Sequence, residues 1–259
     1  MAFGALIYEK RGNIAHVILN RPQVLNSLNL QMRDDLSEVI RAIRGDDEVK
    51  VVIFSGAGRA FCAGADVTEF GTAPSPVISR KVRFERDNWG QLAYLTKPAI
   101  AAMHGFVFGS GLELAMFCDI RIAVEGTVFG LPEMMLGMIP AAGGTQTIGR
   151  TALRGPALQM LITCERIDAG EAYRIGLLNR IVPRDGHLAA AEEVAGRILA
   201  NAPLAVQMAK KAVLLGLDTT LKQGMALEDA LAGMLSTTRD FQIGVKAAVA
   251  AKQPRFVGR

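Results

Sequence analysis

Short apolar runs that alternate with helical segments restrict the fold of this chain more than any other feature. The runs at residues 49–55 and 99–103 are too short for helices, and the first is rich in β-branched residues, which indicates buried strands. Segments with helical periodicity lie between and after these runs. The repetition of strand and helix predicts an α/β fold of stacked βα units with right-handed crossovers.

The other elements follow from the same two periodicities. The pattern is almost purely helical beyond about residue 200, so we expect an α/β core at residues 1–200 and a helical region at residues 201–259. The helical region is too apolar to stand alone and is expected to pack on the core or on a neighbouring subunit. We expect further strands at residues 14–19, 120–124 and 178–183, and helices at about residues 30–43, 77–95, 112–117, 187–200, 203–217, 219–240 and 243–251, with three more beginning near Gly143, Gly155 and Asp168.

Composition excludes several classes of protein. The 259 residues, half of them hydrophobic, suit one large domain or one domain with a helical appendage. The net charge is +4, but the lysines and arginines are scattered, so nucleic-acid binding is only weakly indicated and an anionic small ligand fits equally well. Residues 1–10 show no leader pattern, and no uncharged apolar stretch reaches transmembrane length. We therefore expect a soluble, cytoplasmic protein with no nucleic-acid or membrane partner.

The cysteines and histidines suggest no metal or disulfide chemistry. Cys62, Cys118 and Cys164 are odd in number and far apart, and the three histidines are isolated. No CxxC motif or cysteine–histidine pair is present, so neither a disulfide framework nor a zinc site is indicated. No metal site is expected.

Two carboxylates lie in an apolar stretch between residues 107 and 140. Glu113 follows a glycine-flanked turn and opens an apolar helix, while Glu133 stands between Leu-Pro and Met-Met-Leu. A carboxylate in such surroundings is costly unless it has a partner or a chemical task. Acid–base chemistry and a structural role, as a helix cap or an arginine partner, are equally consistent with the spacing.

Two glycine-rich turns each follow a predicted buried strand. They are Ala63-Gly-Ala-Asp and Gly109-Ser-Gly. Backbone N–H groups at such turns are unpaired, and two that converge on one point form an oxyanion hole; the alternative is a tight strand-to-helix connection. Neither turn matches a dinucleotide or triphosphate fingerprint, and no Ser-His-Asp arrangement is visible.

Six motifs in order along the whole chain resemble the crotonase superfamily, and within it the enoyl-CoA hydratases. Each is weak alone, but their collinear order is specific. The motifs are Asn20-Arg-Pro with Leu25-Asn-Ser-Leu, Ala60-Phe-Cys-Ala-Gly-Ala-Asp, Lys97-Pro-Ala-Ile-Ala-Ala, Gly109-Ser-Gly-Leu-Glu-Leu-Ala with Cys118-Asp, Phe129-Gly-Leu-Pro-Glu with Leu136-Gly-Met-Ile-Pro, and Gly143-Gly-Thr-Gln.

The resemblance implies a fold, an assembly and a substrate class. The fold is the crotonase fold, a core of stacked ββα units with a C-terminal helical trimerisation region that also covers the active site. The assembly is a homotrimer or a dimer of trimers. The substrate is a coenzyme A thioester, and no cofactor is needed because coenzyme A is part of that substrate.

The resemblance also implies roles for individual residues. Ala65 and Ser110 supply the two oxyanion N–H groups. Glu113 activates water, and Glu133 protonates the α-carbon of a 2-enoyl-CoA. Residues implied in substrate binding are Ala63, Gly64, Asp66, Val67, Thr68, Gly109 and Ala141.

The chain departs from the pattern at several of these positions. Ser110 and Ala141 stand where glycine is common, Thr68 replaces a lysine, and Thr147 replaces an arginine. The usual aromatic and basic pattern near the C-terminus is reduced, with Lys252 as a possible substitute. These departures bear on coenzyme A affinity and acyl specificity rather than on reaction class.

Other functions remain open at the level of the sequence. Within the same fold they are an enoyl-CoA isomerase, a dehydratase and a hydrolase; a non-enzymatic alternative is a CoA-thioester or RNA-binding scaffold. The acyl group is not predicted. Its pocket walls are expected from the loop at residues 72–84 and from Met134, Met135 and Met138, of which at least one is expected in the core.

Overall fold

A computed structural model describes residues 3–259 of the chain, apart from the side chains of residues 76, 79 and 83. Met1 and Ala2 therefore lie outside the described residues, and they begin the stretch in which no leader pattern was found. The three side chains belong to the loop expected to line the acyl pocket, and they also lie outside the described residues. A six-stranded sheet forms the centre of the molecule, in the order β1-β2-β3-β4-β6-β9. Its strands are β1 (Leu6–Arg11), β2 (Ile14–Leu19), β3 (Val51–Gly56), β4 (Ala99–Met103), β6 (Ile120–Val124) and β9 (Arg180–Val182).

The strands from β2 to β9 run parallel, and only β1 is antiparallel to its neighbour. This confirms the predicted parallel α/β core. The strand β1, whose Leu6 is buried but whose remaining residues are mostly polar or part-exposed, was not predicted. It pairs with β2 through the tight turn at Gly12, which has a positive φ of 58°.

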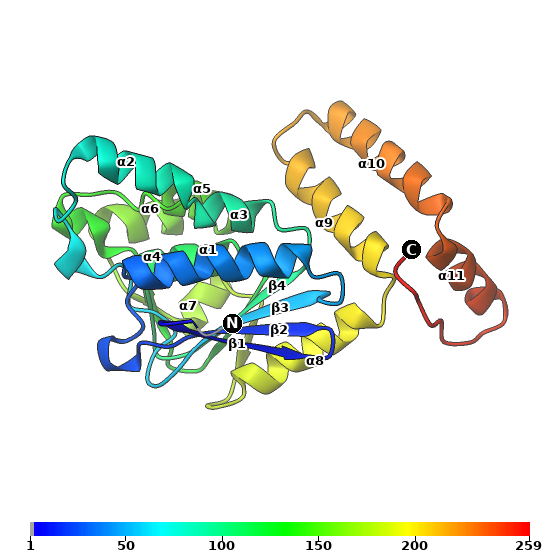
Figure 1. The fold of residues 1–259 in the computed structure, drawn as a ribbon, viewed down its shortest axis with the longest axis horizontal. Coiled ribbons are helices and arrows are strands. Elements are labelled where there is room, and N and C mark those ends of the chain that lie inside the picture. Colours follow the sequence, from blue (N-terminus) through cyan, green and yellow to red (C-terminus); the bar gives the residue numbers. More distant parts are fainter. Residues whose placement is uncertain (1–2) are drawn as a thin grey trace.

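Helices cover both faces of the sheet. Alternate residues point to opposite sides of a strand, so Val52 and Phe54 pack with α1, whereas Val51 and Ile53 pack with α8. Figure 1 shows α1 lying above the strands and α8 below them. The helices are α1 (Leu30–Gly45), α2 (Pro76–Glu85), α3 (Asn88–Ala93), α4 (Ser110–Met116), α5 (Gly144–Thr151), α6 (Arg154–Thr163), α7 (Ala169–Arg174), α8 (His187–Leu199), α9 (Pro203–Gly216), α10 (Leu221–Ser236) and α11 (Arg239–Val249).

The continuous helix expected at residues 77–95 is wrong, because the structure divides it into α2 and α3. Asp87 takes a non-helical conformation between them, and its carboxylate accepts a hydrogen bond from the Gly90 amide at 2.9 Å. A side chain that caps a new helix in this way competes with continuation of the old one.

A small second sheet was not predicted. It joins β5 (Phe106–Phe108), β7 (Val128–Gly130) and β8 (Ile167–Asp168), strands of only three, three and two residues. Strands this short carry too little alternation to be recognised in a sequence. This sheet matters for function because β5 leads directly into the turn before α4.

The C-terminal helices α9, α10 and α11 stand beside the α/β core (Figure 1). The ammonium group of Lys210 on α9 ties them to the core by contacting the Asp119 carboxylate at 2.7 Å and the Lys97 carbonyl at 3.1 Å. The chain end returns to α11, where the Asp240 carboxylate accepts hydrogen bonds from the amides of Val257 and Gly258.

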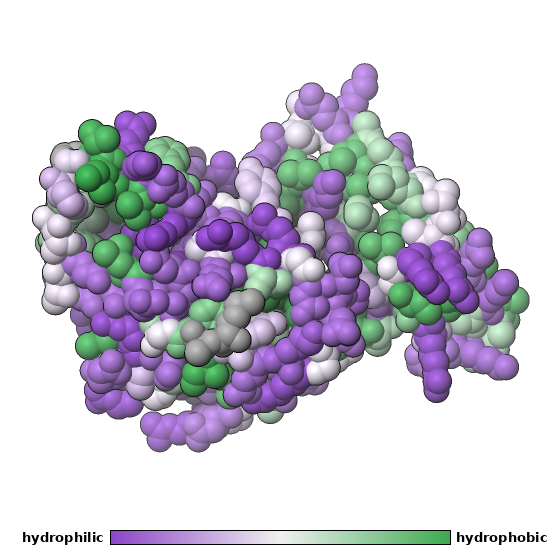
Figure 2. Space-filling view, viewed as in Figure 1, coloured by the Kyte–Doolittle hydropathy of each residue, from purple (hydrophilic) through white to green (hydrophobic). Residues whose placement is uncertain are grey.

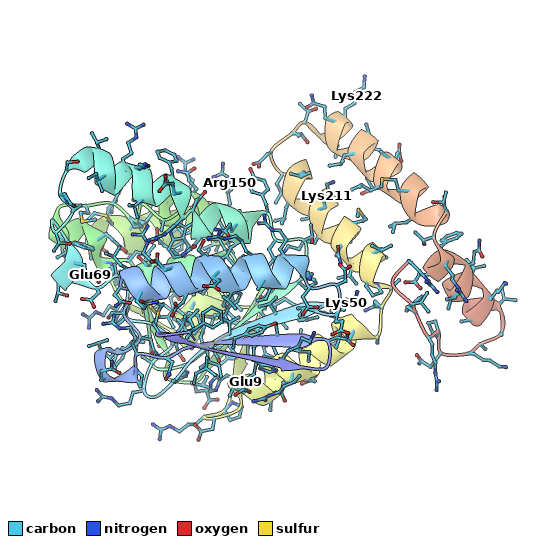
Figure 3. All side chains as sticks on the ribbon, viewed as in Figure 1. Glu9, Lys50, Glu69, Arg150, Lys211 and Lys222 are labelled. Atoms are coloured by element: carbon cyan, nitrogen blue, oxygen red, sulfur yellow. The ribbon has the colours of Figure 1, made fainter. Side chains whose placement is uncertain are left out.

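The surface shows two features relevant to partners. Hydrophobic residues gather over the C-terminal helices in Figure 2. The labelled lysines in Figure 3 lie on separate elements, with Lys50 just before β3, Lys211 on α9 and Lys222 on α10.

Among the described residues, no single helix has the length and apolar character needed to cross a membrane, although α8 and α9, bent by 105° at their junction, meet those criteria as a pair.

Candidate active site

Two glycine turns contact each other at one end of the sheet. The segment after β3 pairs with β5, since the Cys62 amide donates to Phe106 and the Phe108 amide donates to Cys62 at 3.1 and 2.9 Å. A Cβ atom added to Gly64 would lie 3.3 Å from the Phe108 carbonyl oxygen and 3.8 Å from the Gly109 Cα. Both glycines have positive φ values, 108° and 48°, which suit residues without a side chain.

Each turn directs one backbone amide outward. The Gly64 carbonyl oxygen accepts the Leu28 amide at 2.8 Å, and the Gly109 carbonyl oxygen accepts the Glu113 amide at 2.9 Å. In a trans peptide the C=O and N–H bonds point in opposite directions, so the N–H groups of Ala65 and Ser110 point away from these partners. Neither N–H donates a hydrogen bond to another described residue. The arrangement provides two available donors next to each other.

Glu113 lies in the first turn of α4 and is buried, with only 1 % of its surface exposed. Its Oε1 atom accepts hydrogen bonds from the amides of Ala142 and Gly144, both at 2.8 Å. Helix α5 begins at Gly144 after Gly143, which has no side chain to cap it. Glu113 therefore performs the capping role, and the two amides stabilise its negative charge.

Glu133 occupies a short 3₁₀ helix at Pro132–Leu136. Its Oε1 atom lies beside Gly109, where an added Cβ would approach it to 2.6 Å, and its Oε2 atom is buried without a hydrogen-bond partner among the described residues. Burial is the main cause that raises the pKa of Glu133 to about 7, and the nearby charge of Glu113 adds to it. A hydrogen bond from the backbone amide of Glu133 itself lowers this pKa in part. Glu133 thus retains a proton under conditions in which an ordinary glutamate has lost it.

The two carboxyl groups are consequently set up for opposite tasks. Two backbone donors favour the charged form of Glu113, whereas the raised pKa of Glu133 favours its protonated form beside the Gly109 turn. A base and an acid next to two available amides form a site suited to adding or removing the elements of water at an activated carbonyl compound. Glu113 also has the structural role that the sequence left open, because the same carboxylate caps α5.

The other sequence-predicted residues are distributed around this point. Ala63 to Thr68 continue from the first turn into a 3₁₀ helix at Val67–Glu69, whereas Ala141 is an exposed residue just before Ala142, whose amide Glu113 accepts. The Asp66 carboxylate is used within the protein, since it accepts from the Thr68 hydroxyl at 2.7 Å and pairs with Arg21 at 3.0 Å. No group of three or more histidine, cysteine, aspartate or glutamate side chains among the described residues is placed to hold a metal ion.

The methionines expected in the acyl pocket divide into two kinds. Met134 packs against the hydrophobic core. Met135 and Met138 are exposed, with 77 % and 41 % of their surfaces accessible. The expectation that at least one of the three serves the core is confirmed, and Met135 and Met138 are left as candidates for the pocket wall.

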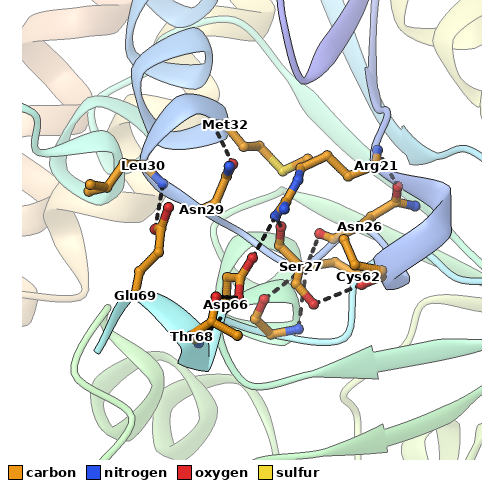
Figure 4. Close-up of polar contacts among 12 residues, drawn as sticks. Arg21, Asn26, Ser27, Asn29, Leu30, Met32, Cys62, Asp66, Thr68 and Glu69 are labelled. Atoms are coloured by element: carbon orange, nitrogen blue, oxygen red, sulfur yellow. Dashed lines mark hydrogen bonds and ion pairs between the residues drawn. The ribbon is translucent and has the colours of Figure 1, made fainter. Parts of the chain in front are cut away.

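Sequence reasoning missed the side chains behind the first turn. Figure 4 shows Arg21, Asn26 and Ser27 next to Cys62 and Asp66. The Asn26 side chain is fully buried and donates to three carbonyl groups of residues 57–61. The motif that contains these residues is visible in the sequence. Its spacing does not predict hydrogen bonds to residues more than thirty positions away.

Comparison with known proteins identifies the family of the chain. Residues 9–259 match the model of the enoyl-CoA hydratase/isomerase family. The chain is 40 % identical over 242 residues to the short-chain-enoyl-CoA hydratase of Clostridium acetobutylicum, with 93 % of this chain and 92 % of that protein covered. It is also 36 % identical over 253 residues to the (E)-benzylidenesuccinyl-CoA hydratase of Thauera aromatica, which covers 96 % and 98 % of the two chains.

Solved structures show the same relationship. The crystal structure of an enoyl-CoA hydratase from Bacillus anthracis superimposes with a TM-score of 0.93 at 33 % identity, covering 98 % of this chain and all of that one. The expected crotonase fold and the resemblance read from the six motifs are both confirmed. By its sequence over almost the entire length and by its fold, the chain belongs to the enoyl-CoA hydratase/isomerase family.

Proposed function

We propose that the chain is an enoyl-CoA hydratase, a hydro-lyase that adds water reversibly across the double bond of a 2-enoyl-CoA thioester. The observation that carries the proposal is the pair of glutamates in opposite environments: Glu113 is bonded to two amides, whereas Glu133 is half-buried with a pKa of about 7. Relatives named as hydratases over nearly the full length support the same reaction.

In the proposed mechanism the thioester carbonyl oxygen accepts the N–H groups of Ala65 and Ser110. These donors polarise the conjugated double bond and stabilise the enolate oxygen that develops as the reaction proceeds. Loss of one such donor typically lowers the rate by ~10²–10³-fold. The coenzyme A portion is proposed to lie along Ala63 to Thr68, with Gly109 and the Ala141 backbone near the acyl group.

The two glutamates divide the proton transfers. Glu113 takes one proton from a water molecule while the water oxygen bonds to the β-carbon. Glu133 gives its proton to the α-carbon, so the product is a 3-hydroxyacyl-CoA. Glu113 then carries a proton and Glu133 a charge, and exchange with water restores the starting state. No cofactor beyond the coenzyme A of the substrate is required.

The acyl group that the site accepts is a separate question. The relatives compared above are named for a short-chain and for an aryl-substituted substrate, so similarity alone does not choose between them. Ser110, half-buried at the start of α4, adds a hydroxyl group beside the proposed thioester position. We propose that Ser110, with Met135 and Met138, restricts substitution near the thioester.

The test is turnover of crotonyl-CoA and a panel of branched, cyclic and aromatic 2-enoyl-CoA thioesters. The wild-type chain is expected to hydrate at least one of them, and Glu113→Gln and Glu133→Gln are each expected to lower kcat by ~10²–10⁴-fold. Unchanged turnover in both variants would refute the mechanism. Double-bond migration without hydration would favour an isomerase, and steeply salt-dependent RNA binding without turnover would favour a scaffold.

A further inference from the structure

Behind the first glycine turn lies a buried side-chain network that the proposed reaction does not use directly. Asn26 is 0 % exposed, and both Leu25 and Asn26 have positive φ values, 53° and 59°. The side chain of Asn26 accepts the Arg21 amide at 2.8 Å and donates to the carbonyls of Ala57, Ala60 and Phe61 at 2.8, 2.8 and 3.2 Å. One buried amide group thus fixes a strained segment of backbone.

That segment in turn holds the turn that contains Ala65. The Ala63 amide donates to Leu25 at 3.0 Å, the Leu28 amide donates to Gly64 at 2.8 Å, and the Asp66 amide donates to Leu28 at 3.0 Å. The bond on Gly64 is decisive, because the Gly64 carbonyl and the Ala65 N–H belong to one rigid peptide plane. Residues 25–28 therefore set the direction of the Ala65 N–H.

Arg21 closes the network from the other side. Its Nη1 atom donates to the Ser27 carbonyl at 2.6 Å and to the Asp66 carboxylate at 3.0 Å, so one guanidinium holds both segments together (Figure 4). The Cys62 thiol adds a contact to the Asn26 carbonyl at 3.1 Å. These contacts join residues far apart in sequence at the position directly behind Ala65.

We propose that Asn26 and Arg21, together the Arg21–Asn26 clamp, are positioning residues that aim the Ala65 N–H at the thioester oxygen. The inference rests on the proposed function, since it gives the amide its task. The clamp touches no reacting atom; it acts by fixing the Gly64–Ala65 peptide plane. An oxyanion donor stabilises charge only where its direction matches the oxygen in the transition state.

The experiment compares Asn26→Ala and Arg21→Lys with Asn29→Ala. Asn29 lies in the same loop and caps α1 by accepting the Met32 amide at 3.0 Å, but it is not part of the clamp. Two quantities are measured for each: kcat and KM for hydration, and the red shift in the absorption of an aryl-conjugated enoyl-CoA thioester on binding. That shift reports polarisation of the bound carbonyl. Thermal melting shows how much stability each variant loses.

Asn26→Ala is expected to lower kcat by on the order of 10²-fold, with a smaller change in KM and a diminished red shift. Arg21→Lys is expected to lower kcat and the red shift less than Asn26→Ala does, because lysine keeps the charge but lacks the planar guanidinium that fixes the two acceptors. Asn29→Ala is expected to lose stability yet keep kcat and the red shift. This pattern separates aiming of the amide from a loss of stability.

A folded Asn26→Ala with wild-type kcat and red shift would overturn the proposal. If Asn26→Ala does not fold, unchanged kcat and red shift in Arg21→Lys would overturn it instead, as would an equal loss in Asn29→Ala. A wild-type chain that shows the red shift but hydrates no thioester would refute the proposed function, and the red-shift series would still decide on the clamp. Lost turnover with an intact red shift in the clamp variants would leave hydration standing and refute the clamp.

Discussion

The single most informative side chain is that of Glu133. Its buried Oε2 atom has no hydrogen-bond partner among the described residues, whereas the Oε1 atom of Glu113 has two amide donors. Two identical side chains thereby lie in different electrostatic surroundings. An unpaired buried carboxyl group is costly to stability, and such a cost is commonly found where the group has a chemical task.

The raised pKa of Glu133 predicts the pH dependence of hydration. Because the pKa is about 7, the proton that Glu133 donates is present below pH 7 and lost as the pH rises through that value. The kcat/KM for hydration is therefore expected to fall above about pH 7, approaching tenfold for each further pH unit. Steady-state kinetics across the pH range test this, and a profile that stays flat well into alkaline pH would contradict the assigned role.

The residues of the site differ in how far the sequence could predict them. Glu113, Glu133 and the two glycine turns are visible in the sequence because charge in an apolar stretch and glycine after a strand are local signals. The protonation state of Glu133 and the bonds of Asn26 depend on groups distant in the chain. Such contacts leave no periodic pattern, so only the folded structure reveals them.

At the scale of elements, α5 depends on a residue from α4. The carboxylate of Glu113 accepts the amide of Gly144, the first residue of α5, and the amide of Ala142, just before the Gly143 cap. Helix ends require such partners, and removal of a capping side chain typically costs about 1 kcal/mol, while an unsatisfied buried donor adds ~1–3 kcal/mol. Glu113 is thus required for stability as well as for chemistry.

This dual role predicts that the two glutamates differ in their effect on folding. Glu113→Ala is expected to lower the free energy of unfolding by about 2 kcal/mol, whereas Glu133→Ala removes an unsatisfied atom and is expected to change it by less than about 1 kcal/mol. Denaturant unfolding of both variants provides the measurement. A loss in Glu113→Ala no larger than that in Glu133→Ala, and below about 1 kcal/mol, would show that the bonds from Ala142 and Gly144 contribute little.

Elements were predictable in proportion to their burial and length. The core strands β3 and β4 are buried on both faces and begin with continuous apolar runs, and in β6 only Arg121 interrupts such a run. The strands of the small sheet have two or three residues, and Asp87 interrupts a stretch that looks continuous by periodicity. The features that bring the two glycine turns together were therefore the least visible in the sequence.

At the scale of the whole molecule, the C-terminal helices present apolar surface beyond the core. Leu221 and Met225 on α10 have 81 % and 58 % of their surfaces exposed, and further exposed apolar residues lie on α9 and α11. Large apolar patches of this kind mark interaction surfaces. We propose that residues 201–259 form a helical oligomerisation region, as family resemblance implies, and that the chain assembles as a homotrimer or a dimer of trimers.

Oligomerisation through these helices predicts the effect of charge on α10. The double variant Leu221→Glu with Met225→Glu is expected to sediment more slowly than the wild-type protein, because it places charges in an apolar contact. Lys222→Gln, on the exposed end of the same helix, is the control and is expected to keep the wild-type assembly. A wild-type protein that sediments as a single chain would contradict the proposed assembly.

Transfer of a water oxygen to the substrate tests the central claim most directly. The wild-type protein is incubated with crotonyl-CoA, or with the panel thioester that it turns over fastest, in water enriched in heavy oxygen, and the product is analysed by mass spectrometry. Hydration predicts a 3-hydroxyacyl-CoA that carries the heavy oxygen on its β-carbon, formed by the wild type and lost in Glu113→Gln and Glu133→Gln. A product without the label, or labelled product formed equally by both variants, would contradict the account.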